Sequence, residues 1–242
     1  MQKIKELLND ILQTLEKNNH RNNNKHYDKI INLQQIIQNK TVALVGPSNS
    51  LHNKKLVKLI DSYDVVIKIN NFHILQSIDY GKKTDILFHN FFRAIPDKSV
   101  INNNIKLLVG SHLFQKSSCN KQSFQKSKKK YNNIPHQDFP EELLSVNIKK
   151  LINDDIWKTS GFRVICLLLD KIDIMKQLNI FGIDFCFNNY NLIYNKTNTL
   201  PPSHNIKKEL YLFKELFKNY KNNKKVVIHD KDFLKYLNET NN

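Results

Sequence analysis

Small polar residues follow several short apolar runs of this sequence, at positions where they could hold a ligand. The run TVALV leads into a turn in which Gly46, Ser48 and Asn49 offer backbone N–H groups, a hydroxyl and an amide. Asn70 and Asn90 end two further apolar runs, although asparagine is a poor strand former. These residues either serve turns and helix caps, or they recognise an anion, a base or a sugar through their polar groups.

A second group of this kind, TSG (159–161), stands directly before a strongly apolar helical pattern. Thr159 and Ser160 supply hydroxyls, and Gly161 leaves room for close approach to the backbone. The first N–H groups of a helix have no partner within the helix, so they can bind an anion. The alternative is that Ser160 only caps the helix.

A polar stretch separates Asp184, at the end of an apolar run, from the helical pattern that starts near His204. Loops of about twenty residues in compact domains are usually functional or disordered. The helix N-terminus disfavours positive charge, so the imidazole of His204 should stay neutral and able to accept a proton. His204 and Glu209 are five positions apart, or about 140° around a helix, and do not share a face. His204 could also simply end the loop, and Glu209 could anchor the site or only stabilise the first helical turn.

Several common types of site are absent from the sequence. The turn GPSNS is neither a Walker loop nor a dinucleotide-binding glycine turn. The three cysteines, Cys119, Cys166 and Cys186, have the spacing of neither a disulfide framework nor a zinc site. Asp154 and Asp155 are adjacent and precede a helix, which is a poor arrangement for a metal. We therefore expect no metal and no cofactor, and a reducing cytoplasm as the location.

The formal net charge of +16 invites a nucleic-acid partner. Nearly all of this charge is lysine, however, since the only arginines are Arg21, Arg93 and Arg163, and arginine is the usual residue for bidentate recognition of phosphates and bases. We therefore expect no nucleic-acid partner. We interpret residues 117–133 as a mobile surface loop, and a basic nucleic-acid-binding module that uses the lysines of residues 121–130 remains an alternative. The lysines could also contact a membrane peripherally, but no apolar run is long enough to span one.

Apolar runs and helical patterns alternate along the chain, which predicts an α/β fold. We expect a Rossmann-like, three-layer α/β/α domain with a mostly parallel sheet over residues 41–242, preceded by an N-terminal helical extension over residues 1–40. In such sheets ligands bind beyond the carboxyl ends of the strands, where the polar residues above would lie. The predicted strands are 41–46, 64–69, 85–90, 105–110, 178–184 and 225–230, and the predicted helices are 53–60, 141–152, 161–172 and 204–220. DYGKKT (79–84) reads as a turn with solvated lysines.

Taken in order, these motifs resemble the sialyltransferases of glycosyltransferase family 29. VALVGPSNSL, IDSYDVVIKINN and DYGKKTDILF, all within residues 42–88, resemble the family's large donor-binding motif. TSG followed by FGID (181–184) resembles the small motif, and HNIKKE (204–209) matches the short terminal motif of a histidine, four residues and a glutamate. The turn containing PS, the asparagines, TSG and GIDF also resemble the bacterial sialyltransferases of family 42.

The resemblance implies an inverting, metal-independent transfer of sialic acid from a CMP-sugar to a hydroxyl of a glycan or glycolipid. It implies that His204 is the general base and that Tyr194 helps to hold the phosphate. The donor would be bound at the motif positions, namely Gly46, Ser48, Asn49, Asn70, Asn90, Thr159, Ser160, Gly161 and Asp184, with Glu209 behind them.

This sequence departs from the family 29 pattern at several positions. Lys68 stands for the usual arginine, and Pro47 stands where an asparagine usually follows the glycine. The histidine expected near Tyr194 is missing, and Thr41 occupies a position where vertebrate members have a disulfide cysteine. With no membrane anchor, these features suggest a reduced, cytoplasmic or membrane-peripheral enzyme. A different CMP-linked ulosonic acid as donor, or a catalytically degenerate relative, are the alternatives.

Overall fold

The computed structural model describes residues 32–70, 72, 76–92, 95, 97, 100, 104–111, 118–153, 159–185 and 206–239. The chain divides into residues 1–30 and 31–242, and every described residue belongs to the second unit. Most of the predicted N-terminal extension therefore lies outside the described residues. The part that is described contains helix α2 (Leu33–Ile37), and both Leu33 and Ile37 are buried in the main hydrophobic core.

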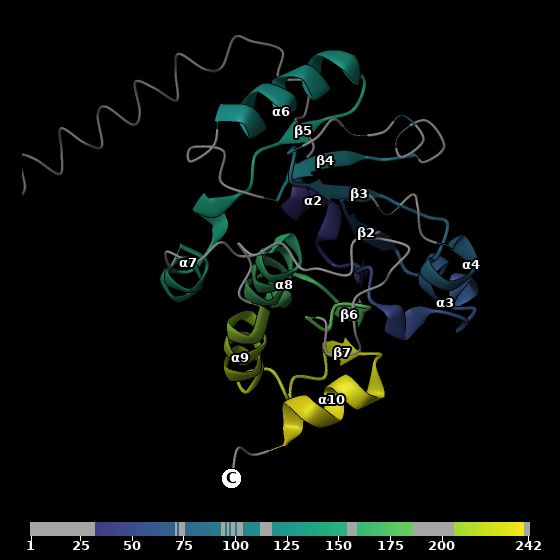
Figure 1. The fold of residues 1–242 in the computed structure, drawn as a ribbon, viewed down its shortest axis with the longest axis vertical. Helices are drawn as coiled ribbons and strands as arrows, with labels where there is room; N and C mark the ends of the chain where they lie inside the picture. Colours follow the sequence, from purple (N-terminus) through teal and green to yellow (C-terminus); the bar gives the residue numbers. More distant parts are fainter. Residues whose placement is uncertain are drawn as a thin grey trace, which may run out of the picture. The chain divides into compact units, whose positions relative to one another are not determined.

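The described strands form one seven-stranded sheet in the order β5-β4-β3-β2-β1-β6-β7, and every neighbouring pair is parallel (Figure 1). Strands β1 to β4 are buried on both faces and mostly apolar, with Lys68 and His89 as buried polar exceptions, which explains the nearly continuous apolar runs in the sequence. The predicted α/β fold is thus confirmed. The strands are β1 (Thr41–Val45), β2 (Val65–Ile69), β3 (Ile86–His89), β4 (Leu107–Gly110), β5 (His136–Gln137), β6 (Gln177–Phe181) and β7 (Val226–Ile228).

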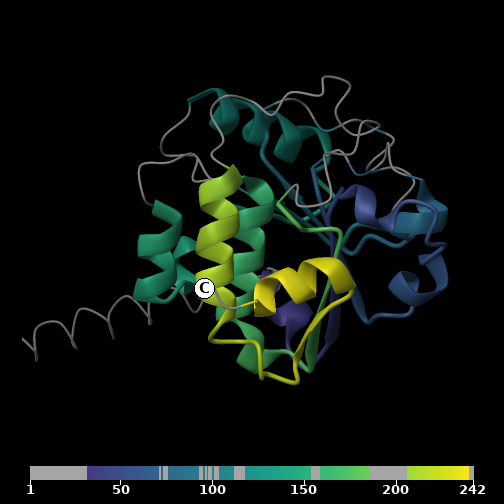
Figure 2. The same ribbon diagram turned by 60° about the horizontal axis from the view of Figure 1, so that its bottom comes forward.

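Helices cover both faces of the sheet, as predicted for three layers. Alternate strand residues point to opposite faces, so Val42 and Leu44 of β1 join one core cluster and Ala43 and Val45 join another. Figure 2 shows α7, α8 and α9 on one side of the sheet and α3 and α4 on the other. The bounds of these five helices and of α10 are α3 (Val57–Asp61), α4 (Ser77–Tyr80), α7 (Val146–Asn153), α8 (Ser160–Asp170), α9 (Ile206–Phe217) and α10 (Lys231–Asn238). No helix among the described residues could cross a membrane.

The lysine-rich segment is a helix, so its interpretation as a mobile surface loop was wrong. Helix α6 (Ser118–Lys130) lies beside β4 and β5 at the edge of the sheet (Figure 1). Phe124, Ser127 and Tyr131 are buried along one side of it, at spacings of three and four residues, while its lysines from Lys121 onward are exposed. This apolar stripe is too narrow to stand out against the lysines in the sequence. Because Phe124 and Tyr131 are buried, they cannot stack on bases, which weakens the nucleic-acid alternative.

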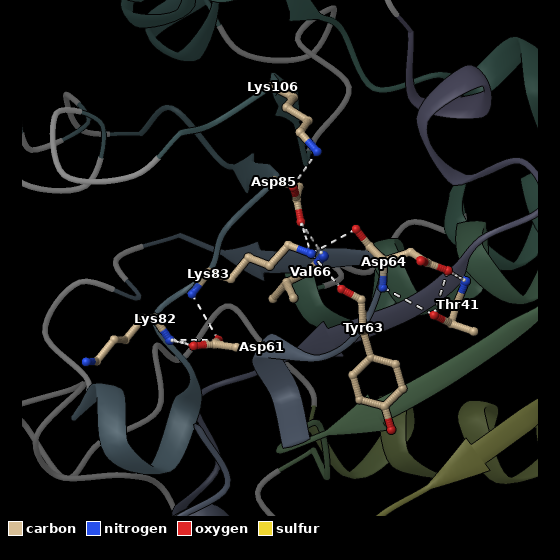
Figure 3. Close-up of polar contacts among 9 residues, drawn as sticks. All are labelled: Thr41, Asp61, Tyr63, Asp64, Val66, Lys82, Lys83, Asp85 and Lys106. Atoms are coloured by element: carbon tan, nitrogen blue, oxygen red, sulfur yellow. Dashed lines mark hydrogen bonds and ion pairs between the residues drawn. The ribbon is translucent and has the colours of Figure 1, made fainter. Parts of the chain in front are cut away.

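Carboxylates tie the strands together at the amino-terminal edge of the sheet (Figure 3). Asp64, just before β2, accepts hydrogen bonds of 2.8 Å from both the backbone N–H and the hydroxyl of Thr41 at the start of β1. Asp85, just before β3, accepts a 2.8 Å bond from the N–H of Val66 and pairs with Lys106 Nζ at 2.8 Å. These contacts help to set the register of β1 with β2 and of β2 with β3, at the end of the sheet opposite to the turn at Ser48.

The DYGKKT turn belongs to the same network. Asp61, at the end of α3, accepts hydrogen bonds from the backbone N–H groups of Lys82 and Lys83 (Figure 3). The Lys83 ammonium donates to the carbonyls of Tyr63 at 2.6 Å and Asp64 at 2.9 Å. The interpretation of both lysines as solvated is therefore wrong for Lys83, which joins this turn to the connection before β2.

Lys68 is a buried lysine inside β2, where it is only 3% exposed. Its ammonium donates a 2.7 Å hydrogen bond to the carbonyl of Gly81 and lies 4.8 Å from the ring centre of Phe72. Burial lowers the pKa of Lys68 from 10.5 to about 8, against a small opposite effect of Asp61. The buried ammonium of Lys68 therefore loses solvation, but it holds the turn at Gly81 through this hydrogen bond.

The pKa of Lys68 predicts a pH dependence of stability. Between pH 8 and 10.5 the unfolded chain holds a proton on this lysine that the folded chain has lost, so the free energy of unfolding rises with pH. The full effect is about 3 kcal/mol. Lys68→Met and Lys68→Arg should both lack this increase, since methionine does not titrate and arginine stays protonated. Urea unfolding of wild type and both variants at pH 7.5 and 10 measures how much the free energy of unfolding changes with pH. An equal change in all three proteins would refute the lowered pKa of Lys68.

Candidate active site

The turns after β1 and β6 press against each other at the carboxyl edge of the sheet. Gly46 N–H donates to the carbonyl of Phe181 at 2.8 Å, and Ser48 N–H donates to that of Gly182 at 3.0 Å. A Cβ on Gly46 would lie 2.3 Å from the Gly182 oxygen, and Gly182 itself has a φ of 60°. A side chain is therefore excluded at Gly46, and Gly182 has the left-handed conformation that glycine adopts most easily.

This backbone contact brings Ser48 to Asp184. The Ser48 hydroxyl donates a 2.6 Å hydrogen bond to the Asp184 carboxylate, and both side chains are buried. Ser48 also accepts from the N–H of Ser50, so it caps the short 3₁₀ helix Asn49–Leu51 as well as meeting Asp184. Asn49 is exposed in that helix, and its side chain has no hydrogen-bond partner among the described residues.

Helix α4, which is distant in sequence, holds the turn at Ser48 in place. The Tyr80 hydroxyl donates a 2.8 Å hydrogen bond to the carbonyl of Ser48. Asp79, which is 1% exposed, accepts 2.9 Å bonds from the N–H groups of Asn53 and Lys55. Asp79 and Tyr80 open the DYGKKT motif, so one half of this motif holds the turn at the carboxyl edge while the other half binds at the opposite edge.

The TSG motif forms the N-terminus of α8, and Glu209 of α9 holds it in place. The Thr159 backbone N–H and hydroxyl donate hydrogen bonds of 2.7 and 2.6 Å to the two carboxylate oxygens of Glu209, which is fully buried. Thr159, rather than Ser160, is the cap, because its oxygen accepts from the N–H of Phe162. The N–H groups of Ser160 and Gly161 find no acceptor among the described residues, so they can bind an anion.

The N-terminus of α8 also reaches the strands on both of its sides. A Cβ added to Gly161 would lie 3.8 Å from Ile183 of the turn after β6. The Ser160 hydroxyl lies 2.9 Å from that of Ser111, which directly follows β4. Ser111 was not among the sequence candidates, although it obeys the same rule as the others: it is the polar residue after a buried strand. Thr159, Ser160 and Gly161 thus connect the turn after β6 with the end of β4.

The two asparagines after β2 and β3 are joined to each other. Asn70, with a φ of 53°, accepts a 3.0 Å hydrogen bond on its side-chain oxygen from the N–H of Asn90. The side-chain oxygen of Asn90 in turn accepts a 3.0 Å bond from the N–H of Phe92. Both amide oxygens are therefore used in turns, and the NH₂ groups of the two side chains are the parts suited to a ligand.

Buried charge surrounds the start of α8. Arg163 lies in its first turn, and its Nε and Nη1 atoms are buried without a hydrogen-bond partner among the described residues. Burial lowers the pKa of Arg163, and the carboxylates of Glu209 and Glu141 raise it in part. In the described ranges no group of three histidine, cysteine, aspartate or glutamate residues could hold a metal. His204 and Tyr194 lie outside the described residues.

A family model described as glycosyltransferase family 29 (sialyltransferase) matches residues 2–142, more than half of the 242-residue chain. The chain belongs to glycosyltransferase family 29. It is therefore a sialyltransferase-type glycosyltransferase, and the resemblance to family 29 seen in its motifs is confirmed. The matched range contains the large motif, whereas TSG and HNIKKE follow it.

Solved sialyltransferases have the same fold. The monofunctional α-2,3-sialyltransferase Cst-I of Campylobacter jejuni aligns with a TM-score of 0.55 and 18% identity over 86% of this chain and 80% of its own. CstII of the same organism gives 0.52 and 19%, with 80% of each chain covered. A mammalian sialyltransferase gives 0.51 and 16% over 79% of this chain and 69% of its own. No curated protein sequence matches this family 29 chain significantly.

The Thr159–Glu209 contact predicts the effect of removing this carboxylate. Glu209→Ala leaves a buried N–H and hydroxyl without their acceptor, which should lower the free energy of unfolding by about 2–4 kcal/mol. Glu209→Gln keeps one carbonyl acceptor and should cost less. The control is Glu215→Ala on the same helix, where the glutamate is exposed and pairs only with Lys218, and should cost less than about 0.5 kcal/mol. Equal urea midpoints for Glu209→Ala and Glu215→Ala would contradict this role.

Proposed function

We propose that this family 29 member transfers sialic acid, or a related ulosonic acid, from a CMP-sugar to a hydroxyl of a glycan or glycolipid. The observation that carries the proposal is at the carboxyl edge of the sheet: the N–H groups of Ser160 and Gly161, which have no acceptor in the described part of the chain, adjoin the turn at Ile183. Solved structures of similar fold contain CMP and CMP-3FNeuAc in CstII, and Gal-β-1,3-GalNAc-ortho-nitrophenol in the mammalian enzyme. The same ligand classes are proposed for this chain.

In this proposal the donor phosphate binds at the N-terminus of α8. The helix dipole and the N–H groups of Ser160 and Gly161 favour an anion there, and the absent side chain of Gly161 leaves room for it. The NH₂ groups of Asn70 and Asn90 face the cytidine or its ribose. CMP-sugars carry one phosphate with a single negative charge, so we propose that no metal is needed to neutralise it.

The proposed chemistry is an inverting displacement. The acceptor hydroxyl loses its proton to the neutral imidazole of His204 and attacks the anomeric carbon of the donor. The bond from that carbon to the phosphate oxygen breaks, and CMP leaves with the bonding electron pair. Tyr194 is proposed to hold the leaving phosphate by a hydrogen bond. General-base assistance of this kind contributes a factor of about 10²–10⁴ in rate.

The direct test of the proposal is nucleotide selectivity. Calorimetric titration should show that CMP binds at least about tenfold more tightly than UMP, AMP or GMP, a difference of about 1.4 kcal/mol. Transfer from CMP-sialic acid to a glycan should continue in EDTA. Equal or tighter binding of uridine diphosphate sugars would overturn the donor, and restoration of EDTA-blocked transfer by manganese would overturn the metal-free mechanism. CMP binding without any transfer would identify a catalytically degenerate member.

The role of His204 has its own test. His204→Ala should lower turnover by about 10²–10⁴-fold and leave the affinity for CMP nearly unchanged, because a base acts mainly in the transition state. The wild-type rate should rise with pH near the imidazole pKa of about 6–7, and this limb should vanish in the variant. Asn70→Ala should instead weaken donor binding first. If His204→Ala weakens CMP binding and wild-type activity falls as pH rises, His204 holds the phosphate as an acid.

A further inference from the structure

Phe92 is an exposed aromatic residue at the carboxyl edge of the sheet. Its side chain is 65% exposed, two residues after Asn90. The other exposed large apolar side chains among the described residues lie on helices away from the strand ends: Leu59 on α3, Ile78 on α4, Val146 on α7 and Tyr211 on α9. Single exposed apolar residues are common and need no explanation. Phe92 differs from these four because of the way in which its turn is built.

The backbone of this turn is fixed by side chains at three successive residues. Asn90 N–H donates to the side-chain oxygen of Asn70 at 3.0 Å, and Phe91 N–H donates to Nδ1 of His89 at 2.9 Å. Phe92 N–H donates to the side-chain oxygen of Asn90 at 3.0 Å. The position at which the phenyl ring leaves the backbone is therefore determined by the same two asparagines that we propose face the nucleotide.

Phe91 anchors the turn from the inside. It is fully buried, and its ring packs edge-on against His89 at 4.9 Å and against Phe124 of α6 at 4.8 Å between ring centres. Its φ of 54° lies in the left-handed region, which costs a residue with a side chain about 1–2 kcal/mol. This strained backbone places the side chain of Phe91 in the core and leaves the side chain of Phe92 exposed to solvent. Strain of this kind concentrates at functional sites.

We infer that the face of Phe92 is a stacking platform for a neutral hexose of the acceptor. This inference rests on the proposed function, and it names a part of the acceptor site. The face of a phenyl ring is electron-rich and attracts polarised C–H bonds, such as those on the apolar side of a β-galactose ring, whereas it repels anions. The phosphate and carboxylate of the donor are poor partners for this ring, and the proposed function already assigns the cytidine to the NH₂ groups of Asn70 and Asn90. The neutral acceptor sugar is the substrate that fits.

The test measures donor and acceptor separately. With CMP-sialic acid and a panel of neutral p-nitrophenyl hexosides, Phe92→Ala should raise the KM for the best acceptor about tenfold, equivalent to about 1.4 kcal/mol. The KM for the donor and the Kd for CMP should stay within about twofold of wild type. Phe92→Trp should keep or lower the acceptor KM. Tyr211→Ala, which removes the other exposed aromatic side chain among the described residues, should change none of these values.

The possible results separate this inference from the proposed function. If wild type neither binds CMP nor cleaves CMP-sialic acid, the proposed function fails, and the inference that depends on it fails too. If wild type binds CMP and cleaves the donor, but Phe92→Ala leaves the acceptor KM unchanged or raises the donor KM equally, only the platform is refuted. Transfer to charged acceptors with none to neutral hexosides would also refute it. Equal thermal midpoints of wild type and Phe92→Ala show that the variant is folded, as expected for an exposed side chain.

Discussion

The candidate site depends on one backbone contact, between Gly46 after β1 and Gly182 after β6. No side chain fits between these two residues, so the turns of adjacent strands lie directly on each other. As a result Ser48 reaches Asp184, and Ile183 lies beside Gly161 at the start of α8. From α8 the contacts continue through Ser111 to β4 and through Thr159 to Glu209 of α9. Separation of the two turns would break the link between the N-terminus of α8 and the turn at Ser48.

The large motif of family 29 serves both ends of the sheet. Asp61, Asp64 and Asp85 accept hydrogen bonds from backbone groups at the amino-terminal edge, so their place in the motif has a structural reason. Ser48 and Asn49 after β1, and Asn70 after β2, are the polar residues of this stretch that lie at the opposite, carboxyl edge of the sheet. Membership of the motif therefore does not by itself place a residue at the carboxyl edge, since the motif contributes residues to both edges of the sheet.

The apolar runs predicted β1 to β4, β6 and β7 because a parallel sheet covered on both faces leaves no polar side in most of its strands. They missed β5, which is the two polar residues His136 and Gln137 at the edge of the sheet. Helix α6 was missed because Phe124, Ser127 and Tyr131 are few among many lysines, and because Phe124 packs on Phe91, which is distant in sequence and follows β3. Ser111 was missed for a simpler reason, since the rule that found Asn70 applies to it as well. The contact between Glu209 and Thr159 spans 50 residues, and no local pattern shows which groups such a carboxylate will bind.

The charges around α8 fit a singly charged phosphate better than a diphosphate. Glu209 places a buried negative charge at the helix N-terminus, where it already occupies the N–H of Thr159 and opposes a second anion. The positive groups that balance it are the helix dipole, the N–H groups of Ser160 and Gly161, and the guanidinium of Arg163, two of whose nitrogen atoms have no partner in the described ranges. A diphosphate would add a further negative charge beside Glu209 and would need a cation to compensate. In the proposed complex a CMP-linked sugar places one phosphate charge here, which the backbone dipoles and Arg163 can offset, so the carboxylate that positions Thr159 is compatible with the proposed donor binding.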